Sequence, residues 1–275
     1  MPTISRWRTK RPVGSAHPTG FMANHLVEFK NVKKRFAHLV VLDGVSLQVE
    51  RGESVVVIGA SGSGKSVMLK HIVGLLRPDD GEVYYDGVRI DPLPEAEIMT
   101  IRRRCGFLFQ MGALFDSLTV GENIGFPIQE HTRKPRDEIA RIVHEKLSMV
   151  GLAGIEKKMP GELSGGQKKR VALARAIALD PELILYDEPT TGLDPIRSDV
   201  INELIIKLQR ELHTTSITVT HDMNSAFKIA NRIVMLHEGK IIIDGTPEKI
   251  KSTDNEIVRR FVIGEADERE LAALK

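Results

Sequence analysis

Strand and helix patterns alternate along this chain, and the alternation predicts an α/β fold with a largely parallel, helix-covered sheet. Two stretches support this prediction. The apolar run 54–58 has the composition of a buried strand, and a glycine-rich loop and helical apolar spacing over 67–73 follow it. From Glu182 onward, strand and helix patterns alternate again as far as Asp244.

The composition is that of a globular protein. The chain has 275 residues, of which 41% are hydrophobic and 28% charged, enough for one large domain or for a domain with a subdomain. No apolar run approaches the ~18–20 residues that span a bilayer, so work at a membrane would need a partner there. The single cysteine, Cys105, cannot form an intrachain disulfide, which fits a reducing compartment.

Residues 1–24 are expected to form a basic tail outside the folded part. They combine Arg and Lys with Pro and Gly, and they contain no apolar segment of a signal peptide. Residues 1–40 hold eight Lys and Arg but only one acid, Glu28. A basic start can favour anionic lipid or nucleic acid, and a solvated tail is the simpler interpretation.

Periodicity and turn residues place the remaining elements in order. Strands are expected at 26–29, 40–42 and 45–49, with a turn at Asp43-Gly44. Helical periodicity over about 111–180 predicts a helical subdomain. The other expected elements are strands at 82–87, 105–109, 182–186, 216–220, 232–236 and 240–244, helices at 95–104, 168–179, 199–212 and 223–230, and a charged helical extension over 251–275.

The loop over 59–66 predicts a phosphate-binding site. Its glycines let several backbone N–H groups point at one anion, and the helix that follows adds its positive dipole end. Lys65 is expected to reach the β- and γ-phosphates, and the Ser66 hydroxyl to bind Mg²⁺. A Gly/Ser-rich turn without a ligand is the alternative. The loop consists of Gly59, Ala60, Ser61, Gly62, Ser63, Gly64, Lys65 and Ser66.

Two adjacent acids, Asp187 and Glu188, end the apolar run 183–186, at the sheet edge where ligands of open α/β sheets bind. Adjacent strand residues point to opposite faces, so the two carboxylates are expected to differ in role. Asp187 suits the Mg²⁺ shell, and Glu188 suits orienting or deprotonating an attacking water. The alternative is a solvated Asp-Glu turn before Pro189.

A second anion site is predicted where a helix begins at 164–167, a stretch named here the helix-start motif. Ser164 is a suitable N-cap, and Gly165 and Gly166, ahead of Gln167, let another molecule approach the helix start closely. Taken alone, this motif would be an ordinary helix N-terminus.

Together these motifs resemble those of ABC-type ATPases, the nucleotide-binding subunits of ATP-driven transporters. The resemblance covers about residues 25–250. It implies a P-loop NTPase fold with a RecA-like, mostly parallel core, an antiparallel β subdomain and a helical subdomain, and it implies hydrolysis of ATP with Mg²⁺. The matching segments, in the order and approximate spacing of the family, are 59–66, Gln110, 163–167, 185–188, 192–195 and His221.

The resemblance also implies roles for single residues. Two copies would form a head-to-tail homodimer in which the helix-start motif of one copy closes over ATP held by the other. Gln110 would contact Mg²⁺ and the attacking water, His221 the γ-phosphate, and Asp194 would communicate across the dimer. Phe36 matches the position whose ring stacks on adenine. For His221 the alternative is a strand-end surface histidine, and for Phe36 a core aromatic.

One position departs from the family pattern. After Ser66 the family commonly has a second hydroxyl residue, whereas this chain has Val67. The change removes a hydrogen bond to the α-phosphate, which would contribute ~0.5–1.5 kcal/mol net. We therefore expect weaker nucleotide binding with an intact hydrolysis geometry.

Segments 111–128 and 159–163 resemble those of ATPases that serve MCE-associated phospholipid transporters of the Mla type. This resemblance implies a membrane permease, an MCE-domain substrate-binding protein and, as a further candidate, a small STAS-domain subunit. The cargo would be phospholipid moved between inner and outer membranes, and the chain would lie at the cytoplasmic face of the bacterial inner membrane. The C-terminal extension would dock on the second ATPase or on the small subunit.

Two other functions stay open from the sequence. An ABC importer or exporter of another cargo, such as an amino acid or a drug, would share every catalytic motif. A regulatory nucleotide-binding module without turnover would not need Gln110, Glu188 and His221 together. No nucleic-acid partner is expected, because the chain has neither the long coiled-coil insertion of DNA-repair members nor the paired ATPase units of translation factors.

Overall fold

The computed structural model describes residues 25–266, and the expected basic tail over 1–24 lies outside the described residues. The larger sheet has six strands in the order β10-β9-β3-β8-β7-β6, and all neighbours in it are parallel except β9 and β10. Its strands are β3 (Ser54–Ile58), β6 (Cys105–Leu108), β7 (Leu183–Asp187), β8 (Thr215–Thr220), β9 (Arg232–His237) and β10 (Lys240–Gly245).

A second, antiparallel sheet has the order β2-β1-β4-β5. The turn predicted at Asp43-Gly44 is wrong, because one continuous strand runs through it. Gly44 has a φ of +80° and is the extra residue of a β-bulge, since Val32 pairs with Val45 and Lys33 with Asp43. The strands are β1 (His25–Phe36), β2 (Leu39–Glu50), β4 (Asp80–Tyr85) and β5 (Val88–Arg89).

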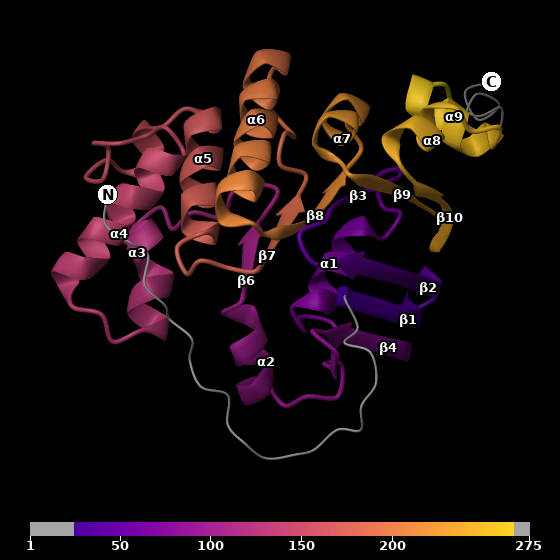
Figure 1. Cartoon of the computed structure of the whole chain (residues 1–275), viewed down its shortest axis with the longest axis horizontal. Helices are drawn as coiled ribbons and strands as arrows, with labels where there is room; N and C mark the ends of the chain where they lie inside the picture. The colour runs from indigo at the N-terminus through magenta and orange to yellow at the C-terminus, as the bar shows by residue number, and fades with distance from the viewer. Residues whose placement is uncertain (1–24, 267–275) are drawn as a thin grey trace.

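Helices cover both faces of the larger sheet (Figure 1). Helices α5, α6 and α7 lie on one face and α1 on the other, while α3 and α4 pack beside α5 at one end. The helices are α1 (Lys65–Ile72), α2 (Glu95–Arg102), α3 (Val120–His131), α4 (Arg136–Met149), α5 (Gly165–Ala176), α6 (Pro195–Leu212), α7 (Met223–Ile229), α8 (Pro247–Lys251) and α9 (Glu256–Ile263), with a 3₁₀ turn η1 (Pro160–Glu162).

Helical structure over 111–180 is less continuous than predicted. Residues 111–119 form no helix, and α3 starts only at Val120, where Thr119 and Glu122 form a reciprocal capping box. Helix α5 begins at Gly165 rather than at 168, because Ser164 caps the backbone N–H of Gln167. Helices α8 and α9 account for part of the expected C-terminal extension, and residues 267–275 lie outside the described residues.

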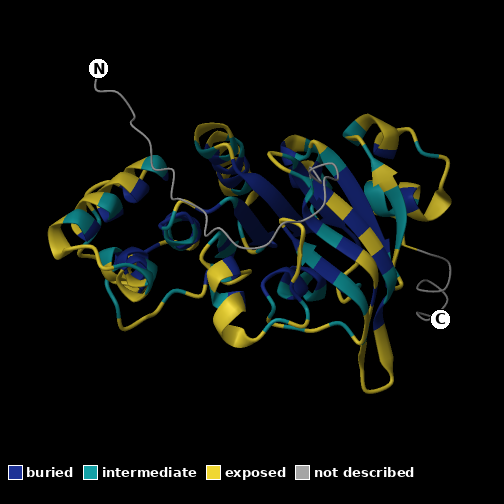
Figure 2. Cartoon of the chain, turned by 60° about the horizontal axis from the view of Figure 1, so that its bottom comes forward, coloured by how far each residue is buried: buried dark blue, intermediate teal, exposed yellow. Residues whose placement is uncertain are grey.

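The alternating sides of the buried strands separate two hydrophobic cores. Val56 and Ile58 of β3 pack with α5, α6 and α7, whereas Val55 and Val57 pack with α1 and the antiparallel sheet. Figure 2 shows the strands of the larger sheet as the buried centre of the molecule. The sheet is therefore covered on both faces, and the carboxyl ends of its parallel strands are where a ligand of such a sheet binds.

Candidate active site

The carboxyl ends of the parallel strands β3, β7 and β8 bring the predicted motifs together. The phosphate loop follows β3, Glu188 follows β7, and His221 follows β8. These three elements meet in a pocket of about 370 Å³. Its lining residues are Phe36, Val41, Ser61, Gly62, Gly64, Lys65, Ser66, Val67, Gln110, Glu188 and His221.

The phosphate loop is shaped by positive φ angles that only glycine adopts easily. Gly59, Gly62 and Gly64 have φ angles of +153°, +81° and +102°. A Cβ on Gly59 would come within 2.3 Å of the Leu236 carbonyl oxygen. The Lys65 ammonium donates to the carbonyl oxygens of Gly59 and Ala60 at 2.8 and 2.9 Å, and burial lowers its pKa against the opposing effect of Glu188. The Lys65 ammonium is thus bound by the backbone of the phosphate loop itself.

Asp187 lies next to the phosphate loop and contacts Ser66. The Ser66 hydroxyl donates to Asp187 Oδ1 at 2.7 Å, and burial raises the pKa of this carboxyl group. A hydroxyl and a carboxylate oxygen in contact are the hard ligands that Mg²⁺ takes through one or two protein groups, with substrate phosphates and water completing the shell. Among residues 25–266, no cluster of three or more His, Cys, Asp and Glu could hold a metal. The Ser66 hydroxyl and the Asp187 carboxylate fit a Mg²⁺ ion whose other ligands are phosphate oxygens and water.

Glu188 is buried and held by several side chains of the site. Its φ of +50° lies in the left-handed region, which costs a non-glycine residue energy and is common at functional sites. Its carboxylate lies 2.9–3.0 Å from His221 Nδ1 and 3.9 Å from Lys65 Nζ. The hydroxyls of Thr191 and Thr220 donate to Oε2 at 3.1 and 3.3 Å. Four side chains thus hold one buried carboxylate at the pocket wall.

The helix-start motif and Asp194 lie away from this pocket. Neither Asp194 nor any residue of 164–167 lines it. Ser164 and Gln167 form a reciprocal capping box at the start of α5, where Ser164 and Gly165 are exposed and Gly166 is buried. Gly165 faces Leu193, and Gly166 faces Arg197 in the first turn of α6, whose N-cap is Asp194. The fold of one copy therefore separates the two predicted anion sites.

Comparison with known proteins decides the family. The family model described as ABC transporter matches residues 42–191. This chain belongs to the ABC transporter ATPase family. As an ABC ATPase, it binds and hydrolyses ATP.

Two curated relatives and one solved structure illustrate the similarity. The intermembrane phospholipid transport system ATP-binding protein MlaF of Haemophilus influenzae is 44% identical over 90% of this chain and 93% of its own. The probable ribonucleotide transport ATP-binding protein mkl of Mycobacterium tuberculosis is 41% identical over 95% and 72%. The dimeric ATP-binding cassette MJ0796 bound to ADP and Pi has a TM-score of 0.75 and 38% identity, covering 80% of this chain and 98% of its own.

Three residues that contact Glu188 were not predicted from the sequence of this ABC ATPase. They are Thr191, Thr220 and Lys169. Lys169 is 7% exposed, its ammonium donates to the carbonyl oxygens of Gln110 and Glu188, and burial lowers its pKa. In the sequence, Lys169 lies in a run of three basic residues, and nothing there distinguishes it from its neighbours.

Proposed function

We propose that this ABC ATPase powers the movement of phospholipid between inner and outer membranes, together with a membrane permease and an MCE-domain protein. The observation that carries the proposal is the 44% identity to MlaF over nine-tenths of both chains, because MlaF is described as part of an intermembrane phospholipid transport system. We place the protein at the cytoplasmic face of the inner membrane, held by the permease. Within residues 25–266, no helix has both the length and the apolar character to cross a bilayer.

An apolar patch on the described surface supports a permease contact. Phe109, Met111, Phe115 and Phe126 are all exposed, Met111 to 87%. The rings of Phe115 and Phe126 lie 5.0 Å apart, and both line a hollow of about 430 Å³ with Phe109. Exposed aromatic clusters of this kind mark protein–protein contacts. We propose that this apolar patch receives the permease.

Within the site, we assign the chemistry to Glu188, His221 and Gln110. Glu188 orients or deprotonates the attacking water, since it is buried, fixed by four partners and within 3.9 Å of Lys65. With His221 Nδ1 in contact with Glu188, the other ring nitrogen would be available to a γ-phosphate oxygen. Ser66, Asp187 and Gln110 would hold Mg²⁺, which would neutralise charge on the phosphate oxygens. Phe36, 43% exposed at the pocket rim, would stack on the adenine.

The helix-start motif is proposed to act on a second copy. Because residues 164–167 lie away from the pocket of their own copy, a head-to-tail homodimer is the arrangement that would bring them to ATP. Ser164 and Gly165, exposed at the start of α5, suit a phosphate approaching from outside. A small STAS-domain subunit is a further proposed partner, for the exposed apolar side chains Ile257 and Ile263 of α9.

The cargo is tested by identifying what accompanies the protein. The tagged chain would be purified with its membrane partners in mild detergent, and co-purifying proteins and lipids identified by mass spectrometry. An MCE protein with bound phospholipid is the expected result. A ribonucleotide or another solute with its own binding protein would overturn the lipid assignment and leave the ATPase intact.

The permease contact is tested on the same preparation. The double substitution Met111→Ser with Phe126→Ser should abolish recovery of the permease, because it removes exposed apolar contact area. The matched control is Leu39→Ser with Val88→Ser, two residues exposed to 65% and 53% on the antiparallel sheet. Equal loss in both variants would contradict the proposed docking site.

The catalytic assignment is tested by Glu188→Gln. The amide keeps the size of the side chain but cannot accept a proton from water, so turnover should fall by more than about 100-fold. ATP binding, measured by fluorescence titration, should stay within a few-fold. Retained hydrolysis would refute the role of Glu188.

A further inference from the structure

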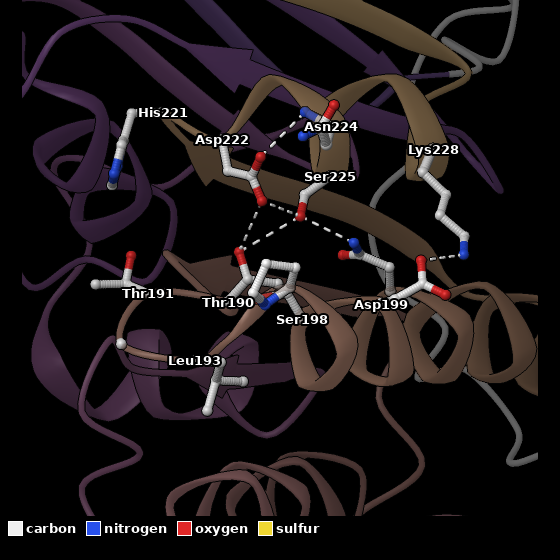
Figure 3. A pocket seen from close by; sticks show the side chains of 13 residues that line it. Thr190, Thr191, Leu193, Ser198, Asp199, His221, Asp222, Asn224, Ser225 and Lys228 are labelled. Carbon is white, nitrogen blue, oxygen red and sulfur yellow. Dashed lines mark hydrogen bonds and ion pairs between the residues drawn. The ribbon is translucent and has the colours of Figure 1, made fainter.

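A polar hollow of about 440 Å³ lies beside His221, between the loops after β7 and β8 and the helices α6 and α7 (Figure 3). Four of its lining residues form a hydrogen-bonded cluster, named here the polar clasp: Thr190, Asn202, Asp222 and Ser225. The Ser225 hydroxyl donates to Asp222 Oδ2 at 2.6 Å and accepts from Asn202 Nδ2 at 2.9 Å. The Thr190 hydroxyl reaches the same Asp222 oxygen at 3.5 Å. The clasp thus joins α6, α7 and the loop after β7.

The clasp is connected to the catalytic pair through the backbone of Asp222, the residue after His221. The Asp222 N–H donates to Thr220 Oγ1 at 3.0 Å, and the Thr220 hydroxyl donates to Glu188 Oε2 at 3.3 Å. The second carboxylate oxygen of Asp222 accepts from the Asn224 N–H at 3.0 Å and so caps α7. His221 therefore lies between two residues whose side chains are hydrogen-bonded, Thr220 and Asp222.

Stability alone does not account for the clasp. Asn202 is 4% exposed, and its Oδ1 atom is buried without a hydrogen-bond partner among the described residues. An unpaired buried acceptor is unfavourable, and an apolar residue of similar size would avoid it. Ser225, at 0% exposure, satisfies Asn202 and Asp222 at once. Such networks restrict side chains to one arrangement, which is what a catalytic pair needs.

We propose that Ser225 and Asn202 are positioning residues for ATP hydrolysis, which act through Asp222 to hold His221 against Glu188. Asn202 lies on α6, whose first turn faces Gly166 of the helix-start motif, so the clasp also ties that surface to the catalytic pair. The inference rests on the roles proposed for His221 and Glu188, and it is independent of the cargo.

The test compares kcat and KM for ATP in the full chain, purified in its native assembly. Ser225→Ala should lower kcat about tenfold and leave KM and ATP binding unchanged, because the lost contact orients a reacting group and touches no nucleotide. Asn202→Leu should lower kcat in the same way without lowering the melting temperature. The matched control is Ser216→Ala, which removes a buried Ser–Ser hydrogen bond to Ser54 at the other end of β8. Its kcat should be unchanged.

The same substitution made in a His221→Ala chain separates a positioning role of Ser225 from a purely structural one. In a His221→Ala chain, Ser225→Ala should cause no further fall in kcat, because the side chain through which it acts is gone. Equal falls in both backgrounds, or an unchanged kcat in Ser225→Ala, would overturn the inference. If His221→Ala itself left kcat unchanged, the proposed role of His221 would be wrong and the positioning role would fall with it. If His221→Ala lowers kcat and Ser225→Ala does not, only the positioning role fails.

Discussion

At the scale of single residues, burial shifts the pKa values of charged groups in the active site. Desolvation lowers the pKa of Lys65 and Lys169 and raises the pKa of Asp187, because each charge has left water for a closed region. The two cations lie near the adjacent carboxylates of Asp187 and Glu188, which oppose part of that cost. The buried charges of the site are therefore unfavourable for folding, and they are of the kind that a bound nucleotide would need.

Removing the Asp187 charge should stabilise the protein while stopping its reaction. The pKa of Asp187 is higher in the folded than in the unfolded protein, so folding favours the protonated acid. The protonated Asp187 therefore stabilises the fold at low pH, and this contribution is lost as the pH rises through the folded-state pKa. At pH 7, Asp187→Asn should raise the melting temperature by about 1–3 °C, and this difference should shrink as the pH is lowered.

The control for that substitution is Asp79→Asn. Hydrogen bonds from the Lys34 ammonium and the Arg35 N–H lower the pKa of Asp79, so its loss should have the opposite sign. Thermal unfolding of both variants over a pH series checks the prediction. A lower melting temperature for Asp187→Asn at pH 7 would contradict the prediction, because it would show that the ionised Asp187 carboxylate does not destabilise the folded protein.

Val67 tests the departure from the family pattern. The residue lines the pocket directly after Ser66. Threonine has nearly the same shape as valine but carries a hydroxyl. In Val67→Thr, one added hydrogen bond of about 0.5–1.5 kcal/mol should tighten ATP binding about 2- to 10-fold. Val67→Ala, which adds no hydroxyl, is the control. ATP affinity from isothermal titration that is unchanged or weaker in the threonine variant would count against this interpretation.

At the scale of elements, the last turn of α5 packs closely on β6. Gly106 of β6 is buried, and a Cβ there would meet the Ala176 carbonyl oxygen of α5 at 2.4 Å. Only a residue without a side chain lets the strand and the helix approach this closely. The glycine within this four-residue strand thus determines how closely the last turn of α5 approaches β6.

Gly106→Ala should therefore push α5 away from the sheet. We expect the free energy of unfolding to fall by about 1–3 kcal/mol, as in other overpacked cores. Gly161→Ala is the matched control, because a Cβ at Gly161 would have nothing within 4 Å. Urea titration of both variants measures the difference. Equal stabilities would mean that β6 and α5 separate at no cost.

At the scale of the whole molecule, the separation of the helix-start motif from the pocket predicts complementation between two inactive variants. Lys65→Met should disable the phosphate loop, and Ser164→Arg should disable the motif. In a mixed dimer, one site pairs the intact loop of one copy with the intact motif of the other, so random mixing should restore roughly a quarter of the active sites.

The mixing experiment distinguishes action on the partner from action within one copy. If the motif served its own pocket, each copy in the mixed dimer would still be defective, and no hydrolysis would return. The rate of phosphate release from the mixture, compared with each variant alone, gives the answer. A mixture as inactive as its components would refute the head-to-tail arrangement.

The sequence alone determined the features that depend on local backbone and residue type. The phosphate loop needs glycines with positive φ angles, a helix start needs a capping residue such as Ser164, and a buried strand needs an apolar run. These requirements lie within a few residues, so they can be recognised without knowing the fold. For the same reason, the α/β class and the order of most elements were predictable.

Only the tertiary structure decided which distant residues meet. Lys169 and Thr220 contact Glu188 because α5 and the ends of β7 and β8 converge, and no local pattern indicates this. The strand through Gly44 is continuous because its partner β1 holds both sides of the bulge, whereas the local Asp-Gly pair favours a turn. Contacts between distant segments are set by packing over the whole chain, and local propensity yields to them.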